Sequence, residues 1–285
     1  MQIIKPTVEY IDYGYSFEDQ LKLAELVGRV SHASEDSITD ESYKSFINRM
    51  LKMKHLSVLE FCQVTLRFQK DNPPMEIIED FFKYIIPLFE HKYAKSSREL
   101  TPEGDFMFVY TNLRVLAELT KAQTLDNILE IYGDFISTSP YKTFDKHTFR
   151  INTSIGVAQQ INRHRANSVL QRSTRYCNYS RDKFGSEISF IEPQWHSFEN
   201  MENLEEAKGI WSQAMKEAEN AYMKLIELGL KAEDARGVLP LDTATKLYHC
   251  SYKEDWEHFI ELRSSSKAHP DTKFISDEIK KLLEN

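Results

Sequence analysis

Four arginines gather in one short stretch of an acidic chain, where their side chains could bind an anion. The four fall within thirteen residues: Arg163, Arg165, Arg172 and Arg175. A guanidinium matches phosphate or carboxylate through two parallel hydrogen bonds, and neighbouring serine and glutamine side chains add neutral partners. Because runs of charge are usually solvated, a solvated basic turn after a helix is an equally good interpretation of the arginines alone.

The residues just before this cluster predict a helix that would position it. Thr153 and Ser154 are N-cap candidates, and no proline interrupts the segment that follows. On such a helix, Gln160, Arg163 and His164 are spaced i, i+3 and i+4 and share one face.

The order of the residues resembles the signature of the flavin-dependent thymidylate synthases. Arg163-His164-Arg165 is followed by seven residues, then by Ser173 and by Arg175-Tyr176. Further blocks resemble the same family: His55, Ser57 and Glu60 before a strand, Arg236 before a Leu-Pro turn, and Arg263 at the end of a Phe-Ile-Glu-Leu-Arg run.

The resemblance implies an α+β fold in which an antiparallel sheet is flanked by helices. It also implies an enzyme that moves a one-carbon unit from methylenetetrahydrofolate to C5 of dUMP and makes dTMP. FAD reduced by NADPH would supply the hydride. Known members are homotetramers whose sites are shared between subunits, so Arg236 is expected to act on the Ser173 region of a neighbouring subunit.

Residue roles follow from the same resemblance, position by position. The dUMP site would consist of Gln160, Gln171, Ser173, Arg175, Arg236 and Arg263. The FAD and folate contacts would come from Ser31, His55, Ser57, Arg163, His164, Arg165, Tyr176, His258 and Lys267. Arg263, as a fixed cation beside the uracil, and His55 are the catalytic candidates.

The chain departs from the family pattern at several of these positions. Leu170-Gln171 stands where many members have Asn-Glu, so Gln171 keeps hydrogen-bonding capacity without the carboxylate. Phe61 replaces a frequent histidine, and His258 and Lys267 stand where asparagine and histidine are expected. These differences leave open a related enzyme that makes another 5-substituted pyrimidine nucleotide, such as hydroxymethyl-dUMP.

Composition limits the other classes of function. The net charge of −8 opposes nonspecific binding to nucleic acid or anionic membrane, which disfavours a noncatalytic nucleotide- or nucleic-acid-binding protein. No G-x-G-x-x-G or Walker loop is present, and the histidines are too widely spaced to form a metal motif. Three scattered cysteines, and the lack of a signal peptide or membrane span, predict a cytoplasmic protein.

The 285 residues are interpreted as a single domain with a helical insertion over residues 70–146. A strand over residues 62–68 alternates cleanly, and another is expected over residues 147–153 and to pair with it. Residues 3–11 are expected to form a strand interrupted by Pro6, and residues 199–228 a long amphipathic helix.

Overall fold

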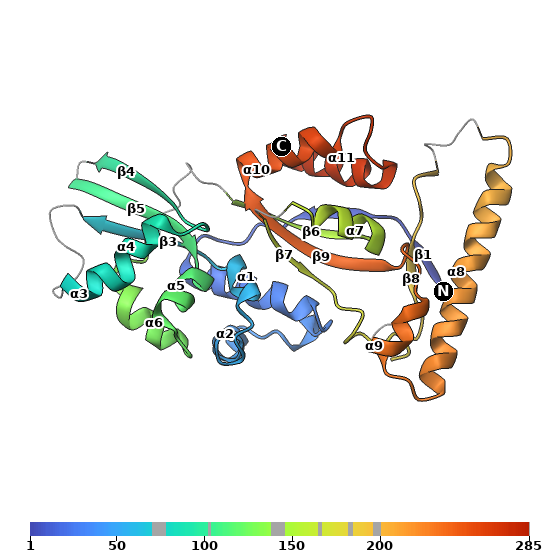
Figure 1. Cartoon of the computed structure of the whole chain (residues 1–285), viewed down its shortest axis with the longest axis horizontal. Coiled ribbons are helices and arrows are strands. Elements are labelled where there is room, and N and C mark those ends of the chain that lie inside the picture. Colours follow the sequence, from blue (N-terminus) through green and yellow to red (C-terminus); the bar gives the residue numbers. More distant parts are fainter. Residues whose placement is uncertain are drawn as a thin grey trace. The chain divides into compact units, whose positions relative to one another are not determined.

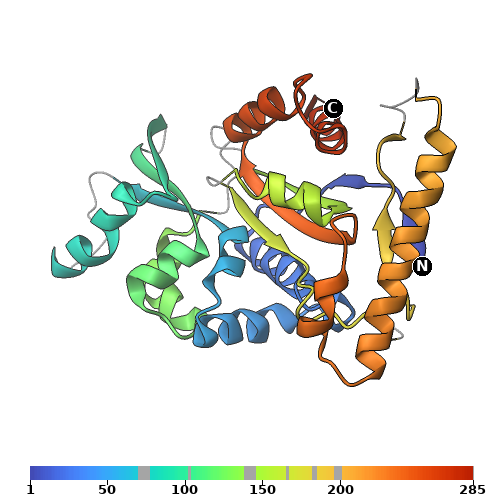
Figure 2. The same cartoon turned by 45° about the vertical axis from the view of Figure 1, so that its right-hand side comes forward.

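The computed structural model describes residues 1–69, 78–101, 104–137, 146–164, 167–181, 185–195 and 201–284. Its contacts separate the chain into two compact units. The first unit comprises Met1–Ile11, Val30–Ala33 and Lys146–Asn285, and the second comprises Asp12–Arg29 and Ser34–Asp145. Each unit has its own sheet with helices packed on it, as Figures 1 and 2 show. The expected α+β class with antiparallel sheets is therefore confirmed.

The first unit is built on a four-stranded antiparallel sheet in the order β2-β6-β9-β7. Its strands are β2 (Thr7–Tyr10), β6 (Lys146–Ser154), β7 (Ser168–Gln171) and β9 (Ala244–Tyr252). A separate parallel pair joins β1 (Gln2–Ile4) to β8 (Ser189–Ile191). Pro6, which has no N–H to donate, lies between β1 and β2, and the two strands enter different sheets.

Three helices cover the four-stranded sheet and build the core of the first unit: α7 (Ile155–Ile161), α10 (Lys253–Arg263) and α11 (Pro270–Glu284). Trp256 and Phe259 of α10 pack with Phe149 of β6 and with Ile161 of α7. Such burial of large apolar side chains contributes about 1.5–3 kcal/mol each. The long helix α8 (Leu204–Glu227) and the short α9 (Ala232–Ala235) form a second cluster with β8 and residues 177–179.

The second unit contains a three-stranded antiparallel sheet in the order β3-β5-β4. Its strands are β3 (Gln63–Gln69), β4 (Lys95–Thr101) and β5 (Gly104–Asn112). Its helices are α1 (Phe17–Val30, whose last residue belongs to the first unit), α2 (Ser42–Met53), α3 (Ile78–Asp80), α4 (Ile86–Glu90), α5 (Leu113–Thr120) and α6 (Leu125–Tyr132).

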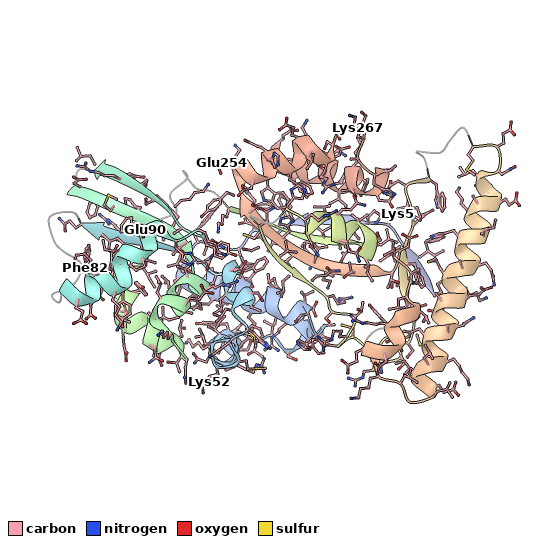
Figure 3. The ribbon with its side chains drawn as sticks, in the orientation of Figure 1. Lys5, Lys52, Phe82, Glu90, Glu254 and Lys267 are labelled. Carbon is pink, nitrogen blue, oxygen red and sulfur yellow. The ribbon has the colours of Figure 1, made fainter. Side chains whose placement is uncertain are left out.

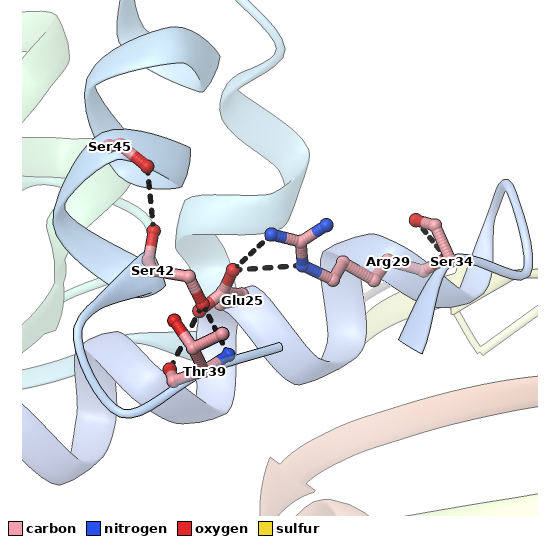
Figure 4. A network of polar contacts seen from close by, with 6 residues as sticks. All are labelled: Glu25, Arg29, Ser34, Thr39, Ser42 and Ser45. Atoms are coloured by element: carbon pink, nitrogen blue, oxygen red, sulfur yellow. Dashed lines mark hydrogen bonds and ion pairs between the residues drawn. The ribbon is translucent and has the colours of Figure 1, made fainter. Parts of the chain in front are cut away.

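A buried carboxylate ties α1 to α2 in the second unit (Figure 4). Glu25 is 1% exposed, and its Oε1 accepts two hydrogen bonds from Arg29, at 2.8 and 2.6 Å. Its Oε2 accepts the hydroxyl of Ser42 at 2.8 Å. Because both oxygens have partners, the charge can remain buried between the two helices.

Two expectations about the middle of the chain differ from the structure. The strand over residues 147–153 forms as β6, but its expected pairing with the strand around Val64 is wrong, because β6 pairs with β2 and β9. The segment 70–146, expected to be helical, also contains β4 and β5, and β5 is the partner of β3. Strand β5 is buried at each of its last five positions, so this part lacks the alternation that would have marked it as a strand.

None of the helices in the described ranges is long and apolar enough to cross a membrane. The three cysteines, Cys62, Cys177 and Cys250, are buried and free. The interpretation of the chain as a single domain stays a prediction.

Candidate active site

Helix α7 delivers the first part of the signature. Ser154 is its N-cap, and its hydroxyl accepts the N–H of Val157 at 3.2 Å, as expected. The helix is shorter than predicted and ends at Ile161, so Arg163 and His164 follow in a turn. The N–H of His164 closes this turn on the carbonyl of Ile161 at 3.1 Å.

Arg263, from the end of α10, joins this turn to the C-terminus of α7. Its Nη2 donates to the carbonyl oxygen of Gln160 at 3.1 Å, and its Nε donates to Nε2 of His164 at 3.0 Å. A cation at the C-terminal end of a helix also interacts favourably with the helix dipole. The side-chain oxygen of Gln160 accepts the hydroxyl of Thr272 in α11 at 3.0 Å.

His164 is held neutral in this arrangement. Burial, and then the electrostatic effects of Arg263 and His258, lower the pKa of His164 to about 4. Because Nε2 accepts the Arg263 hydrogen bond, the ring proton sits on Nδ1. The ring packs edge-on against Phe259, with centroids 4.8 Å apart, and lies 6.4 Å from the ring of His258.

Two hollows open beside this turn. One has a volume of about 450 Å³ and is lined by Arg163, His164, Asn167, Asp255, His258, Leu262 and Arg263. The other, of about 490 Å³, lies along α7 and includes Gln160 and Arg163, with Asp242, His269 and Asp271 among its lining residues. Arg163 is exposed and borders both, so its guanidinium can reach a ligand in either.

The second half of the signature forms a separate cluster of arginines, here called the Ser173 cluster (Ser173, Thr174, Arg175, Glu233 and Arg236). Ser173 Oγ accepts the N–H of Arg175 at 3.2 Å. Arg236 donates through Nη1 to Thr174 Oγ1 and through Nε to the carbonyl of Glu233, both at 3.2 Å. Arg175 Nη2 lies 3.5 Å from the Glu233 carboxylate. The structure thus brings Ser173, Arg175 and Arg236 together within one protomer.

An aromatic stack lies next to this cluster. Tyr176 is half-exposed and stacks on His32, with ring centroids 4.5 Å apart, and the guanidinium of Arg175 lies 5.4 Å from the Tyr176 ring centroid. Ser31, which directly precedes His32, accepts the N–H of Ser173 through its carbonyl oxygen at 3.2 Å. Ser31 and Tyr176, both expected ligand contacts, therefore belong to the surroundings of Ser173.

Gln171 makes two contacts with the protein itself. Its Oε1 accepts from Asn162 Nδ2 at 3.0 Å, and its Nε2 donates to Thr245 Oγ1 at 3.1 Å. The amide therefore pins β7 to the end of α7 and to β9. Lys267 is exposed in the loop between α10 and α11 (Figure 3), and His258 is exposed on α10. Arg165 lies outside the described residues.

His55 and Ser57 belong to the second unit. His55 precedes a 3₁₀ helix, Leu56–Phe61, and both side chains are exposed. Glu60, which completes this block, is buried and forms an ion pair with Arg114 at 2.5 Å. The ion pair between Glu60 and Arg114 therefore holds this block in place within the second unit.

Sequence reasoning missed several polar residues of the site. Glu233 and Thr174 contact the arginines of the Ser173 cluster, and Thr272 holds Gln160. Asn167 and Asp255 line the hollow at the signature turn. Thr174 and Asn167 lie within the signature, so their place in it could have marked them as site residues.

Comparison with known protein families identifies the class to which this chain belongs. A family model described as thymidylate synthase complementing protein matches residues 111–285, more than half of the chain. The chain therefore belongs to this family, and the resemblance to it is confirmed.

Individual relatives carry a more specific name. The chain is 31% identical over 124 residues to a probable flavin-dependent thymidylate synthase of Paramecium bursaria Chlorella virus 1, covering 42% of this chain and 57% of that protein. It is 32% identical over 134 residues to a flavin-dependent thymidylate synthase of Thermus thermophilus, covering 46% and 49%. The chain thus spans about half the length of these curated relatives.

A solved structure, that of the UMP/dUMP methylase PolB from Streptomyces cacaoi bound with 5-Br dUMP, superposes with a TM-score of 0.46. The sequence identity is 14%, and the superposition covers 99% of this chain and 92% of that one.

Proposed function

We propose that this chain is a flavin-dependent thymidylate synthase that converts dUMP into dTMP. Methylenetetrahydrofolate would be the one-carbon donor, and NADPH the reductant. FAD, when bound and reduced, supplies the hydride for this reaction. Family membership and the names of the curated relatives support the assignment.

The observation that carries the proposal is the junction of Arg263 with the signature turn. Two blocks about a hundred residues apart in sequence meet where Arg263 bonds Gln160 and His164. These bonds engage Nε and Nη2, and no contact within the described residues engages Nη1 of Arg263. A guanidinium fixed in this way can stabilise negative charge that develops on a uracil ring as C5 is alkylated, without reorganising during the reaction.

The Ser173 cluster suits the nucleotide phosphate. Arg175 and Arg236 are exposed, and both lie against Glu233, by the carboxylate and the backbone carbonyl respectively. A phosphate dianion can compete with one exposed carboxylate for these donors, because it offers more acceptor oxygens and more charge. Ser173 then acts as a ligand through its hydroxyl.

The donor set around the signature turn also fits FAD. Arg163 is an exposed cation for the diphosphate, and the hollow of about 450 Å³ combines charged donors with planar and apolar side chains. In that hollow, the guanidinium of Arg163 would neutralise the charge of the diphosphate. Leu262 and His258 would pack against the flavin ring system. His164 stays neutral at pH 7, so it donates a hydrogen bond from Nδ1 without adding charge.

We also propose a homotetramer in the cytoplasm. The three free, buried cysteines are consistent with a reducing compartment. His55 and Ser57, exposed in the second unit, remain proposed contacts for FAD or folate, and Lys267 a proposed phosphate contact.

The test is anaerobic turnover of the purified chain with FAD, NADPH, dUMP and methylenetetrahydrofolate, with the nucleotide product identified by mass. A product in which one methyl group replaces one hydrogen is expected. An added hydroxymethyl group would reassign the product while keeping the site. Unchanged dUMP together with no bound flavin would overturn the enzymatic proposal and leave a binding protein.

A further inference from the structure

One carboxylate stands among the basic residues of the signature-turn hollow. Of the described residues that line this hollow, Asp255 alone is acidic, while Arg163, Arg263 and two histidines provide positive charge or N–H donors. If the hollow bound only anions, an acidic lining residue would weaken binding by repulsion. Its presence therefore points to a ligand that carries a hydrogen-bond donor.

Asp255 is held in place by a series of hydrogen bonds between buried and half-buried polar groups. Asp255 Oδ2 accepts the hydroxyl of Ser251 at 3.2 Å, and Ser251 Oγ also lies 2.6 Å from the Asn167 side-chain oxygen. The Asn167 nitrogen lies 2.6 Å from Nε2 of His249. His249 is fully buried on β9 and packs against Trp256, with ring centroids 4.4 Å apart.

Counting protons fixes which group donates and which accepts in each of these hydrogen bonds. With the Asn167 amide as placed, Ser251 would have to donate its single proton to two acceptors at once. Rotating the amide by half a turn gives every donor one acceptor: His249 Nε2–H donates to the Asn167 oxygen, the Asn167 amide donates to Ser251 Oγ, and Ser251 donates to Asp255.

The rotated arrangement also suits His249 itself. Within the described residues, Nδ1 of His249 is buried without a hydrogen-bond partner. When Nε2 carries the proton, Nδ1 is only an unused acceptor, which costs less than a buried N–H group left without an acceptor. The hydrogen bonds thus end on Oδ2 of Asp255, and no contact within the described residues engages its other oxygen, which can accept from a ligand.

We propose that Asp255 accepts the imide N–H of a heterocycle bound in this hollow. An imide N–H donates a hydrogen bond, and a carboxylate oxygen accepts one. Asp255 is thereby a specificity-determining residue, and His249, Asn167 and Ser251 are positioning residues. The inference rests on the proposed function, because both uracil and the flavin ring carry such an imide.

The experiment measures dissociation constants of the purified full-length chain for dUMP and N3-methyl-dUMP, and for FAD and N3-methyl-FAD. In the wild-type protein, N3-methylation should weaken binding of one of the two ligands by at least about tenfold, because it removes the donated proton and leaves the carboxylate without a partner. The pair that responds identifies which ring occupies the hollow.

Asp255→Ala should bring that ratio of dissociation constants to within about threefold, because the acceptor is lost and the methyl group gains room. Ser251→Ala, which keeps the carboxylate but removes its anchor, should lower the ratio part of the way. Glu257→Gln, a change at an exposed position on the same helix, should leave the ratio unchanged.

The outcomes separate this inference from the proposed function. Normal turnover and binding with a ratio that neither N3-methylation nor Asp255→Ala alters would overturn the imide contact alone. Equal weakening of parent and methylated ligands by Asp255→Ala would assign Asp255 a purely structural role and also overturn it. A wild-type protein that binds neither dUMP nor FAD would overturn both proposals.

Discussion

Arg263 shows how a single residue can unite parts of a site that are distant in sequence. Its guanidinium satisfies a carbonyl at the end of α7 and an imidazole in the turn that follows. The same contacts keep His164 neutral, because the neighbouring positive charge adds to the effect of burial on its pKa. One arginine thus fixes the position of the central signature residue and adds to the burial that keeps it neutral.

Replacing Arg175 by alanine tests the nucleotide phosphate site. The change removes a charged donor pair, worth about 1.5–3 kcal/mol, so KM for dUMP should rise roughly tenfold to a hundredfold. Steady-state kinetics over a range of dUMP concentrations measure this change. Arg181→Ala, at another exposed arginine a few residues later, is the matched control and should leave KM within about twofold. A wild-type KM in Arg175→Ala would remove Arg175 from the site.

The buried His249 predicts an acid-sensitive fold. Burial, and then the nearby His164, lower the pKa of His249 to about 3, whereas an unfolded histidine titrates near 6.5. Below about pH 6.5 the unfolded chain therefore binds a proton that the folded chain does not, and stability falls as pH falls toward 3.

At pH 5 this one residue should lower the free energy of unfolding by about 2 kcal/mol relative to pH 7.5. Urea titrations at the two pH values measure it, and the difference should shrink by about that amount in His249→Asn. The same difference in both proteins would mean that folded His249 takes up a proton by pH 5.

At the scale of elements, the short helix α7 determines where the signature turn lies. It has only seven residues, so its intrinsic stability is marginal, and it depends on the Ser154 cap, on burial of Val157 and Ile161, and on Arg263 at its other end. Loss of any of these should displace the signature turn before it unfolds the unit.

Ser154→Ala should lower the free energy of unfolding by about 1 kcal/mol and weaken FAD and dUMP binding as well. Thr124→Ala is the matched control, because Thr124 caps α6 of the second unit through its hydroxyl. It should cost about as much stability with no loss of binding. Equal effects of the two changes on binding would show that general destabilisation, and not the position of α7, is responsible.

The sequence was sufficient to predict the elements whose pattern is local. The Ser154 cap, β3 and α8 follow from hydroxyl position, alternation and helical spacing. The pairing of β3 was not predictable in the same way, because β5 is apolar on both faces and its pattern does not distinguish strand from buried helix. The signature identified the arginines but not Asp255, whose role depends on contacts with Ser251 and Asn167 that only the fold creates.

At the scale of the whole molecule, charge is distributed in favour of small anionic ligands. The chain carries a net charge of −8, yet four of its arginines lie at the signature turn (Arg163 and Arg263) and in the Ser173 cluster (Arg175 and Arg236). The overall field repels long nucleic acid, while the local donors can still bind a phosphate through direct contacts. This combination is what a soluble nucleotide substrate requires.

The Ser173 cluster also bears on how a homotetramer would share its sites. Arg236 contacts Thr174 of its own chain at 3.2 Å, which favours action within one protomer over the expected action in trans. We therefore expect that mixing Arg175→Ala and Arg236→Ala proteins, after dissociation and reassembly, restores no turnover at a dUMP concentration well below their raised KM, because each protomer's own cluster stays defective. Mixing each variant with wild-type protein controls for reassembly. Recovery of a substantial fraction of wild-type activity in the mixture of variants would instead place Arg236 in a neighbouring subunit's site.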